Sequence, residues 1–343
     1  MRMNSFERLM LIASALMTLA LSACRKPSAS VLRAHSVINE ERDGRHIILG
    51  FSQIGAESSW RNCNTQDIIQ AAQKANIQIL VDDAQQKQAN QLKAIRSFIV
   101  YRVDVIAFVP IVETGWDNVL REAKEAHIPV IVVDRKIQTS DKSLVAGYIG
   151  EDTLSEGRKA AEFLTKYFAE KKGPLRIMEI RGTENSSAAR ERSLGFRQVI
   201  GDDRKFSIVY SESGDFLRSR GREIITQFMA RNDGLKLNGK NIDIIFSHND
   251  GMTLGVLDVL EKNGVAPGTD VVIVSVDGEQ SAIDALKAGK LSCVVECNPR
   301  CGEQLMYLVK TVANKNTIPE QTFVQESVFT AGTDFAVLPP RGY

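Results

Sequence analysis

After residue 45 the sequence alternates between short apolar runs, rich in β-branched residues, and longer segments with helical spacing. The apolar runs are 46–52, 77–83, 103–110, 128–134, 143–150, 175–182, 206–213, 242–250, 271–278 and 291–298. Most are nearly continuous in apolar residues, which is typical of strands covered on both faces, as in parallel sheets. Segments between them, such as 65–76 and 251–264, repeat their apolar residues at helical intervals. This alternation predicts right-handed crossovers and a doubly wound α/β fold.

The number of predicted strands also bears on domain organisation. Ten strands are more than a single doubly wound sheet usually contains, and 343 residues are enough for two domains. We therefore expect an α/β fold with two doubly wound parallel-sheet lobes. The boundary between them is expected near 150–152, where the fifth strand ends.

Polar residues gather at the carboxyl ends of the predicted strands, the edge of an open α/β sheet where ligands bind. They are Ser52, Gln53, Asp82, Asp83, Asp134, Arg135, Arg181, Gly182, His248, Asn249, Asp250, Asp277 and Gly278. Some have a purely structural interpretation: Asp250 as a helix cap, Asp277 as part of a turn, and Asp134 in a local ion pair. The repeated mixture of carboxylate, amide and guanidinium at strand ends nevertheless favours a binding site.

Several function classes are disfavoured by the sequence. Lys plus Arg number 43 and Asp plus Glu 42, and no basic stripe with interleaved aromatics is present, so no nucleic-acid partner is expected. The first strand is followed by neither G-x-G-x-x-G nor a P-loop, which argues against a nucleotide. The four histidines are dispersed, and no H-E-x-x-H or G-x-S-x-G motif occurs.

An enzyme is not expected either. Glu57, Asp134 and Asp277 could in principle supply a carboxylate pair for glycoside hydrolysis. However, each has a candidate arginine beside it or in the opposite lobe, and arginine lowers a carboxylate pKa, whereas a general acid needs a raised one. Permanent charges facing a polar neutral molecule suit a binder, with no catalytic residue and no cofactor. The donors and acceptors favour a sugar, whose apolar face Trp60 or Phe216 could cover, although Trp60 also fits simple packing against the first helix.

The N-terminus resembles a bacterial lipoprotein signal. Arg2 and Arg8 lie just before an apolar stretch, 9–24, which ends in Leu-Ser-Ala-Cys. This stretch is shorter than a typical membrane-spanning helix. The expectation is a signal peptide over 1–23, lipid attachment at Cys24 and a lipid-anchored spacer over 24–45. An ordinary signal peptide with an incidental cysteine is the alternative. On the lipoprotein interpretation the mature protein works outside the cytoplasm and is anchored to the membrane through its lipid.

Four other cysteines occur: Cys63, Cys293, Cys297 and Cys301. The last three are spaced C-x3-C-x3-C, which is not a zinc spacing, and no histidine lies near, so no metal site is expected. Cys293 and Cys297 share a predicted strand and would lie roughly 13 Å apart, beyond disulfide reach. A Cys63–Cys301 disulfide and four buried free thiols both remain open.

Several stretches together carry a resemblance to a known family. They are 50–61 (GFSQIGAESSWR), 85–98, 112–126, 132–137 (VVDRKI), 188–196 (AARERSLGF) and 248–252 (HNDGM). From about residue 46 to 328 the chain resembles the periplasmic sugar-binding proteins of the ribose-binding type, the substrate receptors of ABC importers. Within this family it is most similar to galactofuranose-binding members. The segment 330–343 follows the family pattern poorly, apart from its last Gly-Tyr.

The resemblance implies a particular division of the chain. The first sugar-binding lobe takes 46–150 plus 298–325, and the second takes 151–297 plus 326–343. Three chain crossings between the lobes form a hinge. Ligand bound to one lobe then favours closure of the other over it, by as much as its affinity for the two states differs.

The resemblance also implies the binding residues, carried over where the motifs match. They are Glu57, Trp60, Arg61, Asp134, Arg135, Arg192, Asp215, Phe216, Asn249 and Asp277. Arg192 rather than Arg190 is expected to reach the ligand in 188–196. Glu296 stands where the family carries a glutamine, and its role stays open.

The expected function is that of a substrate-binding lipoprotein of an ABC sugar importer. It would capture a monosaccharide, galactofuranose or a related hexose or pentose, between two closing lobes and deliver it to the permease and its ATPase. A monomer is expected. The alternative is a sensor or adaptor that binds a sugar or an autoinducer and signals through a membrane partner.

Overall fold

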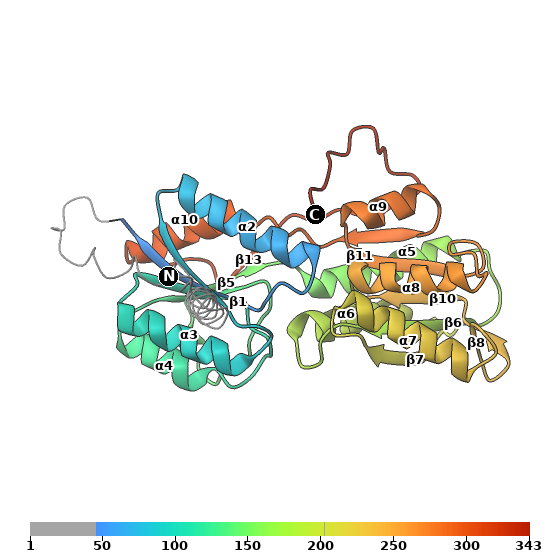
Figure 1. Cartoon of the computed structure of the whole chain (residues 1–343), viewed down its shortest axis with the longest axis horizontal. Coiled ribbons are helices and arrows are strands. Elements are labelled where there is room, and N and C mark those ends of the chain that lie inside the picture. Colours follow the sequence, from blue (N-terminus) through green and yellow to red (C-terminus); the bar gives the residue numbers. More distant parts are fainter. Residues whose placement is uncertain (1–45, 202) are drawn as a thin grey trace, which may run out of the picture. The chain divides into compact units, whose positions relative to one another are not determined.

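The computed structural model describes residues 46–201 and 203–343. The expected signal peptide (1–23), the spacer (24–45) and the lipid-attachment residue Cys24 lie outside the described residues. In the described part, strands and helices alternate along the chain and form two six-stranded sheets (Figure 1). The α/β fold with two sheet-based lobes is therefore confirmed.

The first sheet, the basis of the first lobe, pairs its strands in parallel. In spatial order they are β13 (Gln321–Phe323), β5 (Gly147–Gly150), β4 (Val130–Val133), β3 (Val105–Phe108), β1 (Ile48–Gln53) and β2 (Gln78–Asp83). The helices are α2 (Ser59–Lys74), α3 (Gln88–Tyr101), α4 (Asp117–Glu125) and α10 (Gly302–Ala313), with a short 3-10 helix η1 (Lys142–Leu144). Helices α2 and α10 cover one face of the sheet, and α3 and α4 cover the other (Figure 1).

Strand β1 shows why an apolar run becomes a strand covered twice. Leu49 and Phe51 are fully buried in the core under α2 and α10. Gly50, between them, faces α3, and a Cβ at this position would lie 2.5 Å from the ring of Phe98. The absence of that atom lets α3 approach the strand closely, so helices pack on both faces.

The second sheet, the basis of the second lobe, has a similar topology. In spatial order its strands are β14 (Val328–Thr330), β12 (Cys293–Glu296), β11 (Val272–Asp277), β10 (Ile244–Ser247), β6 (Leu175–Arg181) and β7 (Phe206–Ser213). All pairs are parallel except β12 with β14. Helices α5 (Thr153–Tyr167) and α6 (Ser187–Ile200) pack on one face, and α7 (Arg218–Arg231), α8 (Asp250–Lys262) and α9 (Gln280–Lys287) on the other. A hairpin of β8 (Lys236–Leu237) and β9 (Lys240–Asn241) follows α7.

The strand order reverses at β1 in one sheet and at β6 in the other. Strand β1 lies between β2 and β3, and β6 lies between β7 and β10, so the following strands are added on both sides of it. Such reversal points leave a crevice outside the carboxyl ends of the strands, where ligands bind in this class of fold. Each of the ten apolar runs contains a strand in the structure. The sequence predicts neither β13 nor β14, because three-residue strands with mostly exposed or half-buried side chains carry no apolar run.

The chain passes between the two lobes three times, which confirms the predicted three-crossing hinge. The crossings are 151–152 between β5 and α5, 297–301 between β12 and α10, and 324–327 between β13 and β14. The third crossing connects β13, which belongs to the first sheet, to β14, which belongs to the second.

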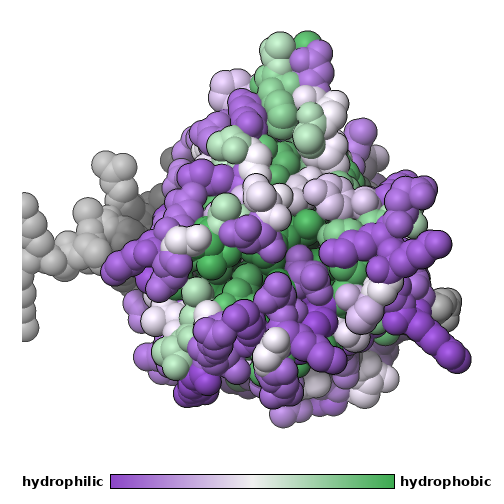
Figure 2. Space-filling view, turned by 90° about the vertical axis from the view of Figure 1, so that its right-hand side faces the viewer, coloured by the Kyte–Doolittle hydropathy of each residue, from purple (hydrophilic) through white to green (hydrophobic). Residues whose placement is uncertain are grey.

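The outer surface fits layered sheets whose helices turn their polar faces outward. Figure 2 shows one face of the molecule, on which hydrophilic residues dominate and hydrophobic ones gather near the centre and at the top. Across residues 46–201 and 203–343, the helices are all too short or too polar to cross a bilayer.

Candidate functional site

The start of α2 places three candidate residues at the carboxyl end of β1. Ser58 is the N-cap of this helix, and its hydroxyl accepts a hydrogen bond from the backbone N–H of Arg61 at 3.1 Å. This cap fixes the first helical turn, from which Trp60 and Arg61 project, while Glu57 directly precedes it. Trp60 and Arg61 are only 4% and 3% exposed. Capping therefore accounts for Ser58 alone and leaves the other three side chains for another role.

Arg61 joins two carboxylates across the first lobe. Its Nε donates to Glu57 Oε1 at 3.0 Å, and its Nη1 lies 2.6 Å from Asp134 Oδ2. The latter two atoms approach off the hydrogen-bonding direction, and among the described residues neither has a hydrogen-bond partner. Both atoms thus retain hydrogen-bonding capacity for a ligand. Burial alone would raise the pKa of Glu57, but Arg61 and Arg135 outweigh it and hold this pKa below its usual value.

Asp134 and Arg135 follow β4 on a strained piece of backbone. Asp134 has φ +61°, in the left-handed region, a conformation that clusters at ligand sites. The Arg135 Nη1 donates to the carbonyl of Ile111 at 3.3 Å, and the guanidinium carbon lies 5.1 Å from the Phe216 ring centre. Burial and the neighbouring Arg61 lower the pKa of Arg135 to about 10, so it is still a cation at neutral pH.

Phe216 brings an aromatic ring from the second lobe. Gly182 makes room for it, since a Cβ there would lie 1.9 Å from the ring. The Arg192 guanidinium carbon lies 5.7 Å from the ring centre, slightly farther than that of Arg135. The ring therefore contacts one guanidinium from each lobe, in the geometry of cation–π pairs.

The Arg192 guanidinium is positioned by an ion pair with the buried carboxylate of Glu156. Gly157 and Gly195 let α5 and α6 meet at backbone contact, because their Cβ atoms would lie 2.1 and 2.0 Å from carbonyl oxygens of the facing helix. The Arg192 Nε then donates to Glu156 Oε2 at 2.5 Å, and its Nη1 donates to the carbonyl of His248 at 2.6 Å. Burial alone would lower the pKa of Arg192, but Glu156 outweighs it and raises this pKa.

Arg190, the other arginine of this motif, has a different environment. Its side chain is 50% exposed and pairs with Glu113 of the first lobe at 2.8 Å. Arg190 thus lies at the rim, where the two lobes meet, whereas Arg192 is buried.

The start of α8 corrects one of the structural alternatives. Its N-cap is Asn249, whose side-chain oxygen accepts a hydrogen bond from the backbone N–H of Met252 at 3.0 Å. The Asn249 Nδ2 donates to the carbonyl of Phe216 at 3.1 Å. The interpretation of Asp250 as the cap is therefore wrong. Its fully buried carboxylate accepts hydrogen bonds from the backbone N–H groups of Gly278 and Glu279, at 2.6 and 2.7 Å. Burial and the nearby Glu279 raise the pKa of Asp250 to about 8.

Asp277 ends β11 with φ +127°, and Gly278 follows at φ +92°. The Asp277 Oδ1 lies 4.0 Å from Arg192 Nη2. Burial and Asp250 raise the pKa of Asp277 well above its usual value, with Arg192 opposing them. This corrects the expectation that arginine neighbours depress the carboxylates of the site, because at Asp277 burial outweighs the arginine.

The C-terminal tail holds the turn after Asp277 in place. Arg341 Nε donates to the carbonyl of Gly278 at 3.0 Å, and the Tyr343 hydroxyl donates to that of Asp277 at 3.4 Å. Glu296, whose role the sequence left open, pairs with Arg341. Glu296 therefore takes part in anchoring the tail, and it is not among the described residues that line the cavity discussed next.

Nine of the ten candidate residues line one cavity. They are Glu57, Trp60, Arg61, Asp134, Arg135, Arg192, Phe216, Asn249 and Asp277. Ser58, Ala188 and Cys297 complete the described lining. The tenth candidate, Asp215, is not part of the described lining, and its carboxylate accepts a hydrogen bond from Ser213 Oγ at 3.2 Å. Asp215 and Phe216 both have left-handed φ, so this turn brings the ring to the cavity while the preceding carboxylate stays at its own strand end.

Cys297 is the lining residue with a chemistry of its own that sequence reasoning missed. Its carbonyl accepts a hydrogen bond from the Trp60 indole N–H at 2.6 Å, and burial raises the pKa of its thiol well above the usual value. It follows directly after β12, so its place at a strand's carboxyl end was the available signal. Within the described residues, all four cysteines are free thiols, which decides against the Cys63–Cys301 disulfide.

The cavity lining carries three carboxylates and three guanidiniums, together with an amide, an indole and a phenyl ring. With all six groups ionised, these charges balance. Such a lining suits a neutral molecule with many hydroxyls better than an anion or a cation, since an ion would leave one set of charges uncompensated.

Comparisons with known proteins agree with this architecture. The family model described as periplasmic binding protein domain matches residues 49–317. Galactofuranose-binding protein YtfQ of Escherichia coli (strain K12) is 36% identical over 281 residues, which cover 82% of this chain and 86% of that protein. A crystal structure from Mycobacterium smegmatis in complex with β-D-fucofuranose is 41% identical, with a TM-score of 0.81, covering 86% of this chain and 95% of that one.

A third relative is the periplasmic binding component of the arabinose ABC transporter from Shewanella sp. ANA-3, bound to α- and β-L-arabinofuranose. It is 38% identical, with a TM-score of 0.79, and the match covers 84% of this chain and 93% of that one. YtfQ and the Shewanella protein are described as binding proteins, and the location typical of the matched family is outside the cytoplasm. The family match, the two-lobed fold and the shared identity lead to one conclusion: this chain belongs to the periplasmic binding protein family.

Proposed function

We propose that this chain is the sugar-binding component of an ABC importer and captures a monosaccharide, in its furanose form, between its two lobes. The observation that carries the proposal is the cavity lined by three carboxylates, three guanidiniums and two aromatic residues contributed by both lobes. Three relatives described by galactofuranose, fucofuranose or arabinofuranose support the furanose form.

The lining can hold a sugar without breaking a bond. Carboxylate oxygens accept hydrogen bonds from hydroxyl groups, and guanidiniums donate hydrogen bonds to hydroxyl oxygens in a fixed fork. Arg61 Nη1 and Asp134 Oδ2, which lack hydrogen-bond partners among the described residues, are a ready donor and acceptor for one hydroxyl. At roughly 1.5–3 kcal/mol for each charge-assisted bond, less the cost of association, a dissociation constant of about micromolar or tighter is expected.

Isothermal titration tests the ring form directly. Methyl galactofuranoside and methyl arabinofuranoside cannot change ring size, and they are compared with the corresponding methyl pyranosides. We expect heat of binding from at least one furanoside and at least tenfold weaker binding of its pyranoside, with no glycoside cleaved on long incubation. Pyranosides that bind as tightly would overturn the furanose preference, and no binding of any sugar would overturn the proposal.

A matched pair of variants tests the site. Asp277→Asn and Asp215→Asn make the same chemical change at two candidate residues, of which only Asp277 lines the cavity. We expect Asp277→Asn to weaken sugar binding tenfold or more and Asp215→Asn to leave it within twofold. Circular dichroism and thermal unfolding check that both variants fold. Equal effects of the two changes would show that the cavity is not the binding site.

The same proposal assigns Cys24 as a lipid-attached residue and a permease with its ATPase as partners. Labelled palmitate should be incorporated into the wild-type chain and not into Cys24→Ser. Deletion of the gene should abolish uptake of the sugar found by titration. Unchanged uptake would reject the importer role while leaving sugar binding itself intact.

A further inference from the structure

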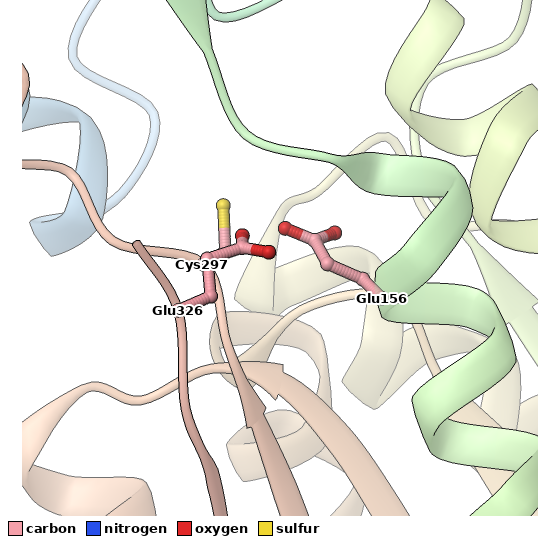
Figure 3. A group of neighbouring side chains, drawn as sticks. All are labelled: Glu156, Cys297 and Glu326. Carbon is pink, nitrogen blue, oxygen red and sulfur yellow. The ribbon is translucent and has the colours of Figure 1, made fainter. Parts of the chain in front are cut away.

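The hinge contains a group of side chains that the sugar cavity does not explain. Glu156 lies in the first turn of α5, just after the first crossing, Cys297 begins the second crossing and Glu326 lies in the third. The Cys297 sulfur and one carboxylate oxygen of each glutamate all lie within 4.8 Å of one another. Figure 3 shows the carboxylates of Glu156 and Glu326 turned toward each other, with the Cys297 sulfur beside them.

The group is buried and its charges are incompletely paired. Glu156 is fully buried, Cys297 is 3% exposed and the Glu326 side chain is 3% exposed. One oxygen of each carboxylate is already bound: Glu156 Oε2 by Arg192 at 2.5 Å and Glu326 Oε2 by Lys159 at 3.3 Å. Among the described residues, the other oxygen of each, Oε1, has no hydrogen-bond partner.

Two carboxylates cannot face each other in a buried place without a positive charge or a proton between them. Glu151, in the first crossing, adds a further buried carboxylate close by, and neither of its oxygens has a hydrogen-bond partner within the described part of the chain. Of these three glutamates, Glu156 is paired with Arg192, which also lines the cavity, and Glu326 with Lys159. Arg61 also acts on Glu151 without donating a hydrogen bond to it.

We propose that Glu156, Cys297 and Glu326 form a binding site for a single divalent zinc-type cation, which joins the three hinge crossings. A thiolate with two carboxylate oxygens is a donor set that Zn²⁺ accepts, with bonds of about 2.3 Å to sulfur and about 2.0–2.2 Å to oxygen. Tetrahedral donors then lie roughly 3.5 Å apart, so side-chain rotation without backbone movement brings donors from within 4.8 Å into place.

The surroundings orient the donors. Arg192 and Lys159 hold the outer oxygens and leave the facing oxygens for the ion, as second partners of metal ligands do. Cys297 also lines the cavity, from which we expect a water molecule to supply the fourth ligand. The sequence showed no metal spacing because the three donors come from positions 156, 297 and 326 and meet only at the hinge.

A cation at this position ties together segments that must bend when the lobes open. We expect bound Zn²⁺ to slow exchange of the sugar between cavity and solvent, and this consequence rests on the proposed sugar-binding function. The binding of the metal does not rest on it, so metal binding without any effect on sugar exchange would separate the two.

The direct test uses the purified full chain, treated with a chelator and then titrated with Zn²⁺ by calorimetry and by equilibrium dialysis with elemental analysis. We expect one Zn²⁺ per chain, with proton release on binding because the thiol must ionise. Co²⁺ in its place should give the ultraviolet charge-transfer band of a cobalt–thiolate bond.

Variants locate the site. Glu326→Gln and Cys297→Ser should each weaken Zn²⁺ binding tenfold or more, whereas Cys63→Ser, which removes a half-buried thiol elsewhere, should leave it unchanged. Glu326→Gln should keep sugar binding, because Glu326 is not among the described residues of the cavity lining. No stoichiometric Zn²⁺ binding, or equal binding by all three variants, would overturn the proposal and leave a shared proton between Glu156 and Glu326.

Discussion

The two walls of the cavity are built from similar residues but differ in how their charges are compensated. On the first-lobe wall, two arginines, Arg61 and Arg135, lie among two carboxylates, Glu57 and Asp134. On the second-lobe wall, Arg192 is the one arginine among the described lining residues. It lies beside Asp277 and depends on a further buried carboxylate, Glu156, for its position.

The two walls shift carboxylate pKa values in opposite directions. On the first wall the pKa of Glu57 is lowered, because Arg61 and Arg135 outweigh burial. On the second wall burial dominates, and it raises the pKa of Asp277 and of Asp250 directly behind it. Glu57 on the first wall therefore keeps its charge at neutral pH, whereas burial on the second wall favours the protonated forms of Asp277 and Asp250. Equal residue types thus produce a fixed electrostatic surface on one lobe and a pH-sensitive one on the other.

Removing an arginine should lower the free energy of unfolding most on the second wall, where Arg192 is the one arginine of the described lining. In Arg192→Ala, the fully buried Glu156 loses its ion-pair partner, and breaking such a pair costs about 3–5 kcal/mol of unfolding free energy. In Arg61→Ala, Arg135 still compensates the nearby carboxylates, so we expect a loss smaller by about half. Urea unfolding without sugar measures both.

A double variant separates folding from binding. Glu156→Gln in the Arg192→Ala background removes the stranded charge and should recover most of the lost stability, while sugar binding stays at least tenfold weaker. The comparison of the walls fails if Arg61→Ala costs as much stability as Arg192→Ala, or if Glu156→Gln recovers nothing.

Much of the first wall was predictable from the sequence, because it depends on local order along the chain. The stretch 50–61 contains a strand end, a cap and the side chains of the next helical turn, and their positions follow from strand and helix geometry. Asp134 and Arg135 likewise follow a buried strand directly. The resemblance to the family then identified these strand ends as one site.

The second wall depends on packing between distant segments, which local patterns do not report. Glu156 meets Arg192 only because Gly157 and Gly195 let two helices touch, and the raised pKa of Asp277 follows from the fold around it. The exclusion of Asp215 from the described lining depends on one turn's left-handed backbone. None of these features has a periodicity or motif in the sequence.

The pH dependence of stability should differ in sign between the walls. Asp250 has a folded pKa raised to about 8, so its contribution is fully present below its unfolded pKa of about 4 and is lost as pH rises toward 8. Asp250→Asn keeps the hydrogen-bond acceptor for Gly278 and Glu279 but cannot ionise. We expect the variant to lose this decline and to be more stable than wild type at pH 8 by at least about 1.4 kcal/mol, the equivalent of one pKa unit.

Glu57→Gln is the matched change on the first wall. Because the folded pKa of Glu57 is lowered, its contribution is present above its unfolded pKa and is lost as pH falls through the folded value. The variant should therefore be less stable than wild type at neutral pH and approach it in acid. Urea unfolding from pH 8 down to about pH 2 covers both transitions, because the folded pKa of Glu57 lies below its ordinary value. Parallel pH profiles for the two variants would contradict the distinction between the walls.

The smallest expected effect lies at the rim, where the walls meet through Arg190 and Glu113 at 2.8 Å. Arg190 is 50% exposed, so the pair should contribute about 0.2–1 kcal/mol, and only while the lobes are together. Arg190→Ala should then weaken sugar binding by up to about fivefold at low salt and less at high salt, because screening already weakens an exposed pair. Arg218→Ala breaks a pair with Asp258 within the second lobe, in which the arginine is similarly exposed, and should leave sugar affinity unchanged. Equal effects of the two changes would show that the rim pair does not hold the walls together, and that closure depends on the buried cavity groups alone.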